Sequence, residues 1–430
     1  MVYQLDKGVY RMKTFKEALD ITNQLINDII FMCETRTKST YFTRNGKMSF
    51  KSTILFILNF VKKSIQLELD AFFKSIASEK TSITKQGYSE ARKKISPTAF
   101  IKMANGITSW YYKDDDYKTY RGYRLCAIDG SIMELNNSEI LRQSFGYIDN
   151  RSMKVARARA SAIYDVENDM ILTSKIAKFT TGERDLAIEL IDQLKEIGLK
   201  KDLILFDRGY PSSKLISHLE KSNIKYLMRV SSSFIKSINE VTGEDQIVEV
   251  KVDGKKIKIR VVKFMLESGE EEKLITNLID ENLSIDEFKA LYFKRWGIEV
   301  KYDELKNRLQ IENFTGDTPI AVEQDFYASI YLSNMAAIAK AEANLEISKK
   351  NEGKNLKYEY KVNTNILIGK LKDSLVLALL ENNKIKRSKM IKKIMKEISQ
   401  NVIPIRPGRS NKRKSTNRDY RYPLNQKDCL

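Results

Sequence analysis

Four side chains of unlike chemistry recur at helical spacing late in the 430-residue chain. They are a phenol, a guanidinium, a carboxylate and an ammonium group: Tyr292, Arg295, Glu299 and Lys306. Steps of three, four and seven residues at about 100° each put this mixed stripe within a sector of roughly 60° on one helix, from Tyr292 to Lys306. Because such groups are costly to bury without charged partners, we expect a surface that holds a metal ion beside a phosphate chain. The simpler alternative is a solvated helix on which Arg295 and Glu299 form an i, i+4 pair.

Two aspartates follow short apolar runs earlier in the chain. Asp129 ends the run that begins at Arg124, and Asp207 ends the run that begins at Asp202. Continuous apolar runs of this length are typical of strands buried on both faces, and α/β proteins place ligands at the carboxyl ends of such strands. For either aspartate alone, a turn residue that caps the next element is the alternative. Together with Glu299 they supply three hard oxygen ligands, which favour Mg²⁺ or Mn²⁺ over zinc.

The residue types that other catalytic sites need are scarce. The chain has one histidine, His218, so a histidine-rich metal site, a Ser-His-Asp triad and a Cys-His pair are all disfavoured. It has neither a Gly-x-x-x-x-Gly-Lys-Ser/Thr loop nor a Gly-x-Gly-x-x-Gly fingerprint, so no nucleotide cofactor is indicated. The three cysteines, Cys33, Cys126 and Cys429, lack pairing or zinc spacing, which suits a reducing cytoplasm.

A formal net charge of +19 indicates a polyanionic partner, either nucleic acid or an anionic membrane. No apolar run approaches the ~20 residues of a membrane span, and the N-terminus lacks the pattern of a signal peptide, so we expect no membrane insertion. Seven basic residues between Lys384 and Lys396, with no acid among them, favour nucleic acid, although a basic amphipathic helix also suits a membrane surface or a partner helix. The basic segment from Arg406 to Arg421 is expected to stay extended until it meets a phosphate backbone.

Hydrophobic periodicity predicts an α/β fold with helical N- and C-terminal regions. After a helical start, three strands, a helix and a strand–helix–strand unit follow in the order of a ribonuclease H-like core. Alternation on either side of Asp253-Gly254 predicts a hairpin in a β-rich insertion ahead of the glutamate-bearing helix. The basic segment Thr84 to Pro97 either docks on a DNA end or forms an ordinary solvated helix face. The expected regions are a helical DNA-binding region at 1–115, the first part of the core at 116–230, the insertion at 231–280, the last part of the core at 281–345, and a helical C-terminal region with a basic tail at 346–430. The core strands are expected at 123–129, 160–165, 170–177, 202–207 and 224–230.

Three sequence blocks resemble the catalytic blocks of the DDE transposases of bacterial insertion sequences. They are Asp129 in Asp-Gly, Asp207 in Asp-Arg-Gly-Tyr, and the spaced set of Tyr292, Arg295, Glu299 and Lys306. The spaced set is the signature of the insertion sequence four family and is the most specific of the three. The resemblance covers roughly Tyr88 to Phe314 and recurs in the basic C-terminal tail.

The resemblance implies a two-metal mechanism. In such enzymes two Mg²⁺ or Mn²⁺ ions, ~4 Å apart, act on the attacking and leaving oxygens of a phosphodiester. By resemblance Asp129 bridges both ions, and Asp207 and Glu299 each complete the shell of one ion. Water attacks first and exposes a 3′-OH, which becomes the nucleophile of strand transfer.

The resemblance also assigns residues to DNA. Tyr292, Arg295 and Lys306 are expected to grip phosphates of the transposon end near the cleavage position, including a hairpin intermediate. A guanidinium suits this task because it forks two hydrogen bonds onto a phosphate. The weaker candidates for DNA contact are Arg208, Tyr210, Arg157 and Arg159, the last two with Arg151 and Lys154 beside them. Arg208 and Tyr210 follow Asp207, and if they do not contact DNA they are expected to orient it. The others lie between predicted strands, and if they do not contact DNA they are expected to be solvated.

Aromatic residues receive two further assignments. A base-stacking aromatic is expected in the insertion, at Phe234 or Phe264. Trp296 points away from the mixed stripe and is assigned to core packing.

The function implied by the resemblance is cut-and-paste DNA transposition in a bacterial cytoplasm. The expected partners are double-stranded DNA, as transposon terminal inverted repeats and as target, and a second copy of the chain in a homodimer. The expected cofactors are two Mg²⁺ or Mn²⁺ ions per site, with no nucleotide cofactor and no membrane. Two alternatives stay open: a ribonuclease H-like nuclease without strand transfer, and a basic DNA-binding descendant that has lost cleavage.

Overall fold

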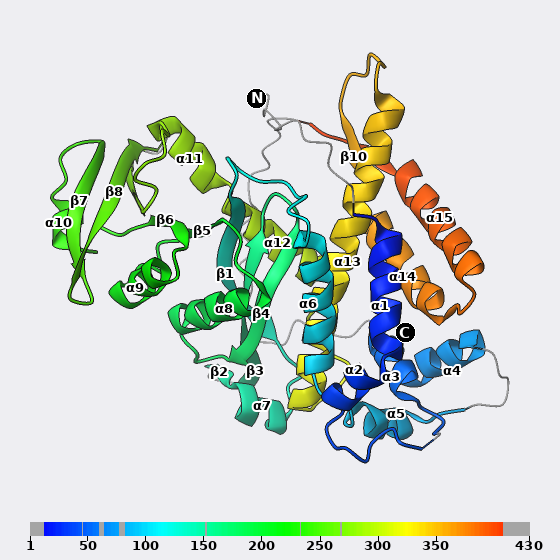
Figure 1. The fold of residues 1–430 in the computed structure, drawn as a ribbon. Coiled ribbons are helices and arrows are strands. Elements are labelled where there is room, and N and C mark those ends of the chain that lie inside the picture. The colour runs from blue at the N-terminus through cyan, green and yellow to red at the C-terminus, as the bar shows by residue number, and fades with distance from the viewer. Residues whose placement is uncertain are drawn as a thin grey trace. The chain divides into compact units, whose positions relative to one another are not determined.

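The computed structural model describes residues 13–44, 46–59, 64–76, 82–150, 153–232, 234–266 and 269–406. These residues form two compact units, each built from segments that are distant in the chain (Figure 1). The helical unit takes the described residues within Met1–Tyr117, Glu134–Ala156 and Asn307–Leu430. The sheet unit takes those within Lys118–Met133 and Arg157–Lys306.

The sheet unit contains most of the strands, of which β1 and β3 continue into the helical unit. The strands are β1 (Arg124–Glu134), β3 (Met153–Asp165), β4 (Met170–Lys178), β5 (Asp202–Phe206), β6 (Lys225–Arg229), β7 (Asp245–Val252), β8 (Lys255–Met265) and β9 (Glu271–Thr276). The helices are α8 (Glu183–Ile197), α9 (Ser213–Lys221), α10 (Lys236–Asn239), α11 (Ile285–Phe293) and α12 (Trp296–Asn307).

Together with β2 (Tyr147–Asn150), the strands form one mixed sheet in the order β2–β3–β1–β5–β6–β9–β8–β7, and β4 also pairs with β3. β1, β5 and β6 are parallel, whereas β3–β4, β6–β9, β8–β9 and β7–β8 are antiparallel pairs. The order β4–β3–β1–β5–β6, with helices between the later strands, is the one expected for a ribonuclease H-like core. The predicted α/β fold class is therefore confirmed.

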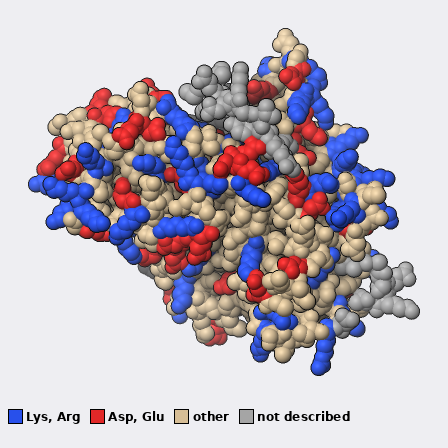
Figure 2. All heavy atoms as spheres, in the orientation of Figure 1, with Lys and Arg blue, Asp and Glu red and all other residues tan. Residues whose placement is uncertain are grey.

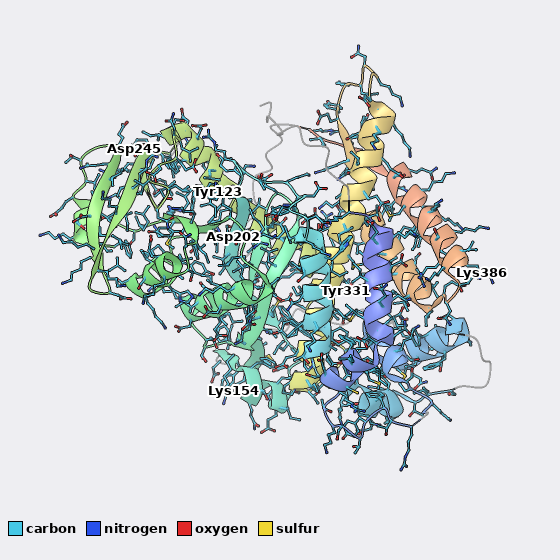
Figure 3. The ribbon with its side chains drawn as sticks, viewed as in Figure 1. Tyr123, Lys154, Asp202, Asp245, Tyr331 and Lys386 are labelled. Carbon is cyan, nitrogen blue, oxygen red and sulfur yellow. The ribbon has the colours of Figure 1, made fainter. Side chains whose placement is uncertain are left out.

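A buried ion pair sets the register of two central strands. Arg124 begins β1 and lies opposite Asp202, which begins β5 and is labelled in Figure 3. The guanidinium donates from Nε to Oδ1 of Asp202 at 2.6 Å and from Nη2 to Oδ2 at 3.1 Å, and both side chains are buried. Because a slip of one residue would separate the pair and leave two unpaired buried charges, this register is strongly specified.

Two strands are longer than predicted. β1 continues past Asp129, and β3 begins at Met153 instead of near residue 160. The basic residues Lys154, Arg157 and Arg159 therefore lie on strand β3 and not in a connection, whereas Arg151 lies outside the described residues. The first half of β3 alternates basic residues with alanine, and alanine has a weak strand preference, so the local pattern underestimates the strand.

The strands expected in an insertion extend the same sheet. β7 and β8 form the predicted hairpin, at whose tip Asp253 and Gly254 both have positive φ, 47° and 80°. β9 then returns and pairs antiparallel with β6, for example Met228 with Ile275. The insertion is therefore continuous with the core sheet. Local alternation predicts such strands but carries no information on which distant strand they pair with.

The helical unit packs around one long helix, α13, of 33 residues. Tyr331 near its middle is fully buried, and its hydroxyl lies 2.8 Å from Oγ1 of Thr22 on α1 (Tyr331 is labelled in Figure 3). None of the helices in the described part of the chain combines the length and the apolar character that a membrane crossing needs. The helices of the unit are α1 (Phe15–Asn27), α2 (Ile29–Thr35), α3 (Phe50–Ile57), α4 (Ile65–Ile76), α5 (Lys85–Arg92), α6 (Thr98–Tyr112), α7 (Glu139–Phe145), α13 (Pro319–Asn351), α14 (Thr364–Leu380) and α15 (Lys384–Gln400), and its short strands are β2 (Tyr147–Asn150), β10 (Tyr360–Val362) and β11 (Val402–Pro404).

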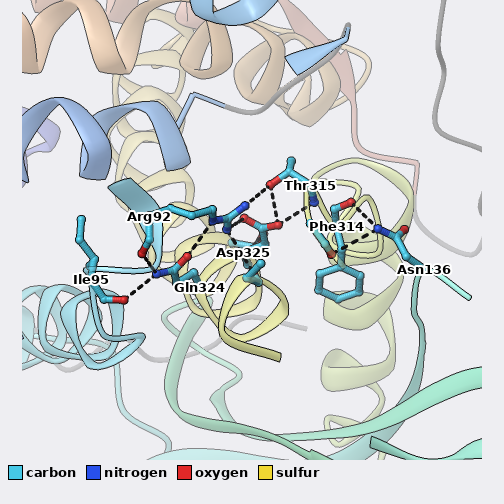
Figure 4. Close-up of polar contacts among 10 residues, drawn as sticks. Arg92, Ile95, Asn136, Phe314, Thr315, Gln324 and Asp325 are labelled. Atoms are coloured by element: carbon cyan, nitrogen blue, oxygen red, sulfur yellow. Dashed lines mark hydrogen bonds and ion pairs between the residues drawn. The ribbon is translucent and has the colours of Figure 1, made fainter. Parts of the chain in front are cut away.

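A buried polar network ties α5 to α13 (Figure 4). Arg92 donates to Oε1 of Gln324 at 2.8 Å, to Oδ1 of Asp325 at 2.8 Å and to Oγ1 of Thr315 at 2.7 Å. Gln324 in turn donates its amide to the backbone oxygen of Arg92 at 2.9 Å. Arg92 belongs to the segment considered for docking on a DNA end, and its burial removes this cation from any such surface.

Candidate active site

Asp129 and Asp207 lie side by side on neighbouring parallel strands. β1 and β5 pair from Arg124↔Asp202 to Ala127↔Leu205, and two residues further this register places Asp129 beside Asp207. The five residues of β1 before Asp129 are buried, and exposure of the strand begins at Asp129 itself. The structure therefore brings the two aspartates together. Asp129 lies inside a strand, so it is not the turn residue of the simpler alternative.

Backbone and side-chain hydrogen bonds hold the two aspartates in place. The Gly130 N–H donates to Oδ1 of Asp129 at 2.8 Å, and the Gly209 N–H donates to Oδ1 of Asp207 at 2.7 Å. The backbone oxygen of Asp129 accepts two further bonds, from Oγ of Ser161 at 3.0 Å and from the hydroxyl of a buried tyrosine at 3.1 Å. Residues of both β3 and α12 thus hold the backbone of Asp129 in position.

The glutamate-bearing segment is two helices, α11 and α12, separated at Lys294 and Arg295. Through the break the backbone tightens to bonds that span three residues, such as the Arg295 N–H to the oxygen of Tyr292 at 3.0 Å. Gly297 follows the break, where a Cβ would lie only 3.1 Å from Cγ1 of Val166. Glycine lowers helix propensity and allows this close approach. The single continuous helix predicted for the mixed stripe is therefore wrong.

Arg295 joins Glu299 to Asp129. Its Nη2 donates to Oε1 of Glu299 at 2.7 Å, and its Nη1 lies 3.9 Å from Oδ2 of Asp129. The Arg295 side chain is 12% exposed, so water screens its charge only weakly. The i, i+4 pair of the simpler alternative is present, but it also reaches the aspartate of β1. A solvated helix surface would make no such contact.

The three acids interact electrostatically. Burial raises the pKa of Asp129 to about 6, and the charges of Asp207 and Glu299 act in the same direction. The Gly130 N–H and Arg295 act against this rise. A carboxyl group whose pKa is raised beside two other acids is typical of functional sites.

The other two members of the mixed stripe lie near Asp207 and against the later part of β1, respectively. Burial raises the pKa of Tyr292 to about 12, an effect that Arg295 and Arg229 oppose and the charge of Asp207 supports. Lys306 donates from Nζ to the backbone oxygen of Ile132 at 2.6 Å, on the part of β1 beyond Asp129. Despite the helix break, all four stripe residues therefore lie within one unit and beside one edge of its sheet.

The weaker candidates for DNA contact separate into exposed and buried side chains. Arg208 is exposed beside Asp207. Arg159 donates to the carboxylate of Glu183 and is mostly covered. Tyr210 is 0% exposed and Arg157 is 4% exposed. Because both of these side chains are buried, neither offers a surface for the direct DNA contact that was predicted for it.

Four residues that the sequence interpretation missed surround the acids: Ser161, Glu183, Arg229 and Tyr302. Tyr302 is the buried tyrosine whose hydroxyl bonds to the backbone of Asp129, and Glu183 lies against Gly130. Arg229 ends β6, pairs with Glu272 and acts on Tyr292. Its position at the end of the third parallel strand was a usable signal. Nothing local indicated Ser161 or Glu183.

The aromatic assignments have mixed outcomes. Trp296 is 46% exposed, so its assignment to the core is wrong, and the break between α11 and α12 changes the face on which it lies. Phe264 is half-buried with Nζ of Lys289 5.7 Å from its ring centroid, and Phe234 is also half-buried. The choice between these two phenylalanines stays a prediction.

The donor set suits a hard divalent cation, although the carboxylates are not gathered around one point. Among the described residues, no three His, Cys, Asp or Glu side chains are close enough together to hold an ion. Arg295 supplies positive charge between Asp129 and Glu299 instead. The hydroxyl of Tyr210 is buried without a hydrogen-bond partner in the described part of the chain, near the charges of Asp129 and Asp207. An orphaned hydroxyl of this kind fits a site that bound water or a hydrated ion completes.

Comparisons with known proteins identify a family and a similar solved structure. Residues 120–335 match a family model described as the transposase DDE domain. A similar solved structure is the cryo-EM structure of a piggyBac transposase synaptic complex with hairpin DNA, at 12% sequence identity and a TM-score of 0.45, covering 87% of this chain and 85% of that chain. Among curated proteins, none matches this chain. The matched range contains all three acids and the whole mixed stripe.

Proposed function

Because the chain belongs to the transposase DDE domain family, we propose that it moves an insertion sequence by cut-and-paste DNA transposition. In this proposal it hydrolyses phosphodiester bonds at the transposon ends with the help of divalent metal ions and joins the freed 3′ ends to target DNA. It does so as a homodimer on two terminal inverted repeats, in the cytoplasm of a bacterium. The observation that supports the proposal is the placement of Asp129 beside Asp207 on neighbouring parallel strands, with Glu299 linked to Asp129 through Arg295.

The three acids would hold the metal ions, with Asp129 shared between two of them. Mg²⁺ or Mn²⁺ would stabilise negative charge on the attacking and leaving oxygens of the phosphodiester. Asp129 suits the shared place because its pKa responds to both Asp207 and Glu299. The chain itself contributes orientation, through the Gly130 and Gly209 amides that hold the carboxylates.

Arg295 can pair with two classes of partner, carboxylates of the protein and phosphates of DNA. In the free protein it balances the charges of Asp129 and Glu299. A DNA phosphate offers the same two-oxygen acceptor and carries a full negative charge. Transfer of the guanidinium to a phosphate would leave the carboxylates available to cations when DNA is present. The proposed site therefore couples the binding of DNA to the binding of metal.

The remaining hydrogen-bond donors and cations of the site would position the DNA backbone. The high pKa of Tyr292 keeps its phenol protonated, so it can donate to a phosphate oxygen. Lys306 and the exposed Arg208 add positive charge on either side of the acids. Arg159 acts through Glu183 and supports the position of Gly130, so it is a positioning residue in this proposal.

Replacement of Glu299 tests the proposal directly. E299Q keeps the size of the side chain and an oxygen that can accept from Arg295, but it removes a charged metal ligand. We expect loss of Mg²⁺-dependent cleavage of a duplex that carries a transposon end, with end binding largely retained. E196Q, which changes an exposed glutamate of the same unit, is the matched control. Equal cleavage by E299Q and the unchanged chain would contradict the proposed site.

A joining assay separates transposition from the alternatives. Pre-cut transposon ends are incubated with a supercoiled target plasmid and Mg²⁺, and joined products are measured. Joining supports a transposase. Cleavage without joining would indicate a ribonuclease H-like nuclease, and DNA binding with neither reaction would indicate a descendant that has lost catalysis.

A further inference from the structure

A second cationic surface lies on the helical unit. α15 carries a lysine stripe whose members are Lys386, Lys389, Lys392, Lys393 and Lys396, all of them exposed. At about 100° per residue these five positions fall within roughly 120° of the helix circumference. Figure 2 shows blue atoms gathered over this helix, and Lys386 is labelled in Figure 3.

No close partner compensates the charge of the lysine stripe. None of its five ammonium groups forms an ion pair or hydrogen bond with another residue that the structure describes, and Glu397 acts on Lys393 only at longer range. The single acid of α15, Glu397, pairs with Lys370 at 2.5 Å. Other exposed lysines of the helical unit differ, since Lys93 and Lys102 lie 2.7 and 2.6 Å from a glutamate. The stripe is therefore a local concentration of positive charge and not an ordinary salt-bridged surface.

The opposite side of α15 is anchored in the helical unit. Its apolar residues Ile391, Ile394, Met395 and Ile398 are buried, and the helix contacts α13 and α14. Arg387 is also buried and donates to Oδ1 of Asp20 on α1 at 2.9 Å. Of the large apolar side chains of the helix, Ile385 alone is strongly exposed, at 70%. A membrane-surface helix needs a free apolar face, which α15 does not have.

The lysine stripe conflicts with the local preferences of a helix. Lys384 and Lys386 lie in the first turn, where the helix dipole favours acids, and that turn contains none. Lysines at spacings of three and four residues also repel one another. A local conflict without a stabilising partner is typical of a functional surface. Phosphates placed along the stripe would remove the conflict.

We propose that the lysine stripe of α15 is a second DNA-docking surface, which binds the phosphates of a duplex without reading its sequence. The inference rests on the proposed function, because the acid site is what brings DNA to this protein. From Lys386 to Lys396 the stripe extends about 15 Å along the helix axis, and duplex DNA carries one charge per about 1.7 Å. Lysine ammonium groups are mobile point charges that suit phosphate contacts better than base recognition.

The test is the salt dependence of DNA binding by the full chain. The variant K386Q/K389Q/K393Q removes three charges of the stripe, and the control K195Q/K236Q/K350Q removes three lysine charges that each have an acidic neighbour. Dissociation constants for a mixed-sequence duplex are measured over a series of salt concentrations. Each lost phosphate contact lowers the slope of log K against log salt by about 0.9, so we expect a fall of about 2–3 for the stripe variant and none for the control. Removal of the repulsion should leave the Tm of the stripe variant equal or about 1 °C higher.

The possible outcomes distinguish this inference from the proposed function. A lower slope with an unchanged or higher Tm supports the docking surface. An unchanged slope overturns it, and the proposed function stands if the unchanged chain still binds and cleaves DNA. Failure of the unchanged chain to bind duplex DNA overturns both. A second assay measures binding to vesicles that contain phosphatidylserine. If the unchanged chain binds these vesicles and the stripe variant does not, while the variant still binds DNA as the unchanged chain does, the stripe belongs to a membrane contact and the inference is overturned.

Discussion

Two arginine–carboxylate pairs lie on either side of the stretch over which β1 and β5 pair. At the start of β1 and β5, Arg124 forks onto Asp202 at 2.6 and 3.1 Å, and both side chains are buried. At the far end, Arg295 bonds to Glu299 at 2.7 Å but comes only within 3.9 Å of Asp129, in a partly exposed position. The first pair is saturated, so it fixes the register of the strands. The second has one loose contact at 3.9 Å, and in the proposed function a phosphate and a cation would replace its partners.

Substitution of an acid at the far end should have the largest effect, a loss of DNA cleavage. D207N keeps the volume of the side chain and the oxygen that accepts from Gly209, but it removes a charged ligand at the sheet edge. We expect Mg²⁺-dependent cleavage to fall on the order of 10³-fold or more, equivalent to about 4 kcal/mol or more of barrier. Cleavage rates at saturating DNA measure the effect. A loss smaller than about tenfold would mean that Asp207 does not serve the reaction.

The near end should be sensitive in stability. R124M leaves the Asp202 carboxylate buried without its partner, which should cost about 3–5 kcal/mol of unfolding free energy. In the double variant R124M/D202L both charges are absent, so most of the unfolding free energy that R124M loses should be regained. Urea unfolding measures both variants. A cost below about 1 kcal/mol for R124M would show that the pair does not hold the register.

The exchange of partners around Arg295 at the far end can be measured without a cleavage assay. Removal of the guanidinium in R295Q frees Asp129 and Glu299 from their counter-ion, so the free protein should bind Mn²⁺ about tenfold more tightly. The same change should lower DNA cleavage about 10–10²-fold, because the phosphate loses a bidentate donor. R295K keeps the positive charge but not the bidentate donor, so its Mn²⁺ affinity and its cleavage rate should lie between those of R295Q and the unchanged chain. Unchanged Mn²⁺ affinity in R295Q would contradict the competition between guanidinium and metal.

Repulsion among the acids should appear as a small effect on stability. The pKa of Asp129 is raised to about 6 by burial and by its acidic neighbours, so the folded state holds this proton more tightly than the unfolded state does. The resulting penalty is absent below about pH 4, builds up between about pH 4 and 6, and is fully present at neutral pH. D129N should therefore raise stability by about 1 kcal/mol at pH 7.5 without divalent ions, and the gain should vanish near pH 4. Thermal melts over this pH range provide the measurement, and a gain that does not change with pH would exclude the electrostatic cause.

Much of the candidate site follows from local sequence patterns. Asp129 and Asp207 each follow an apolar run, and the run itself predicts the buried strand that carries the acid to the sheet edge. Asp253-Gly254 predicts the hairpin of β7 and β8, because both residues tolerate the positive φ that the turn requires. The spacing of Arg295 and Glu299 likewise predicts their contact, since one helical turn separates them. In each case the relevant interaction involves residues close together in the chain.

Other features depend on segments that are distant in the chain. The pairing of β9 with β6 turns the expected insertion into part of the core sheet, and burial withdraws Tyr210 and Arg157 from the surface. The contact of Arg295 with Asp129 depends on where the break between α11 and α12 lies against β1.

The sequence by itself thus determined which acids and cations this protein has and the fold class that presents them. Only the tertiary structure decided which charge compensates which, because periodicity defines the face of an element but not the element that packs against it.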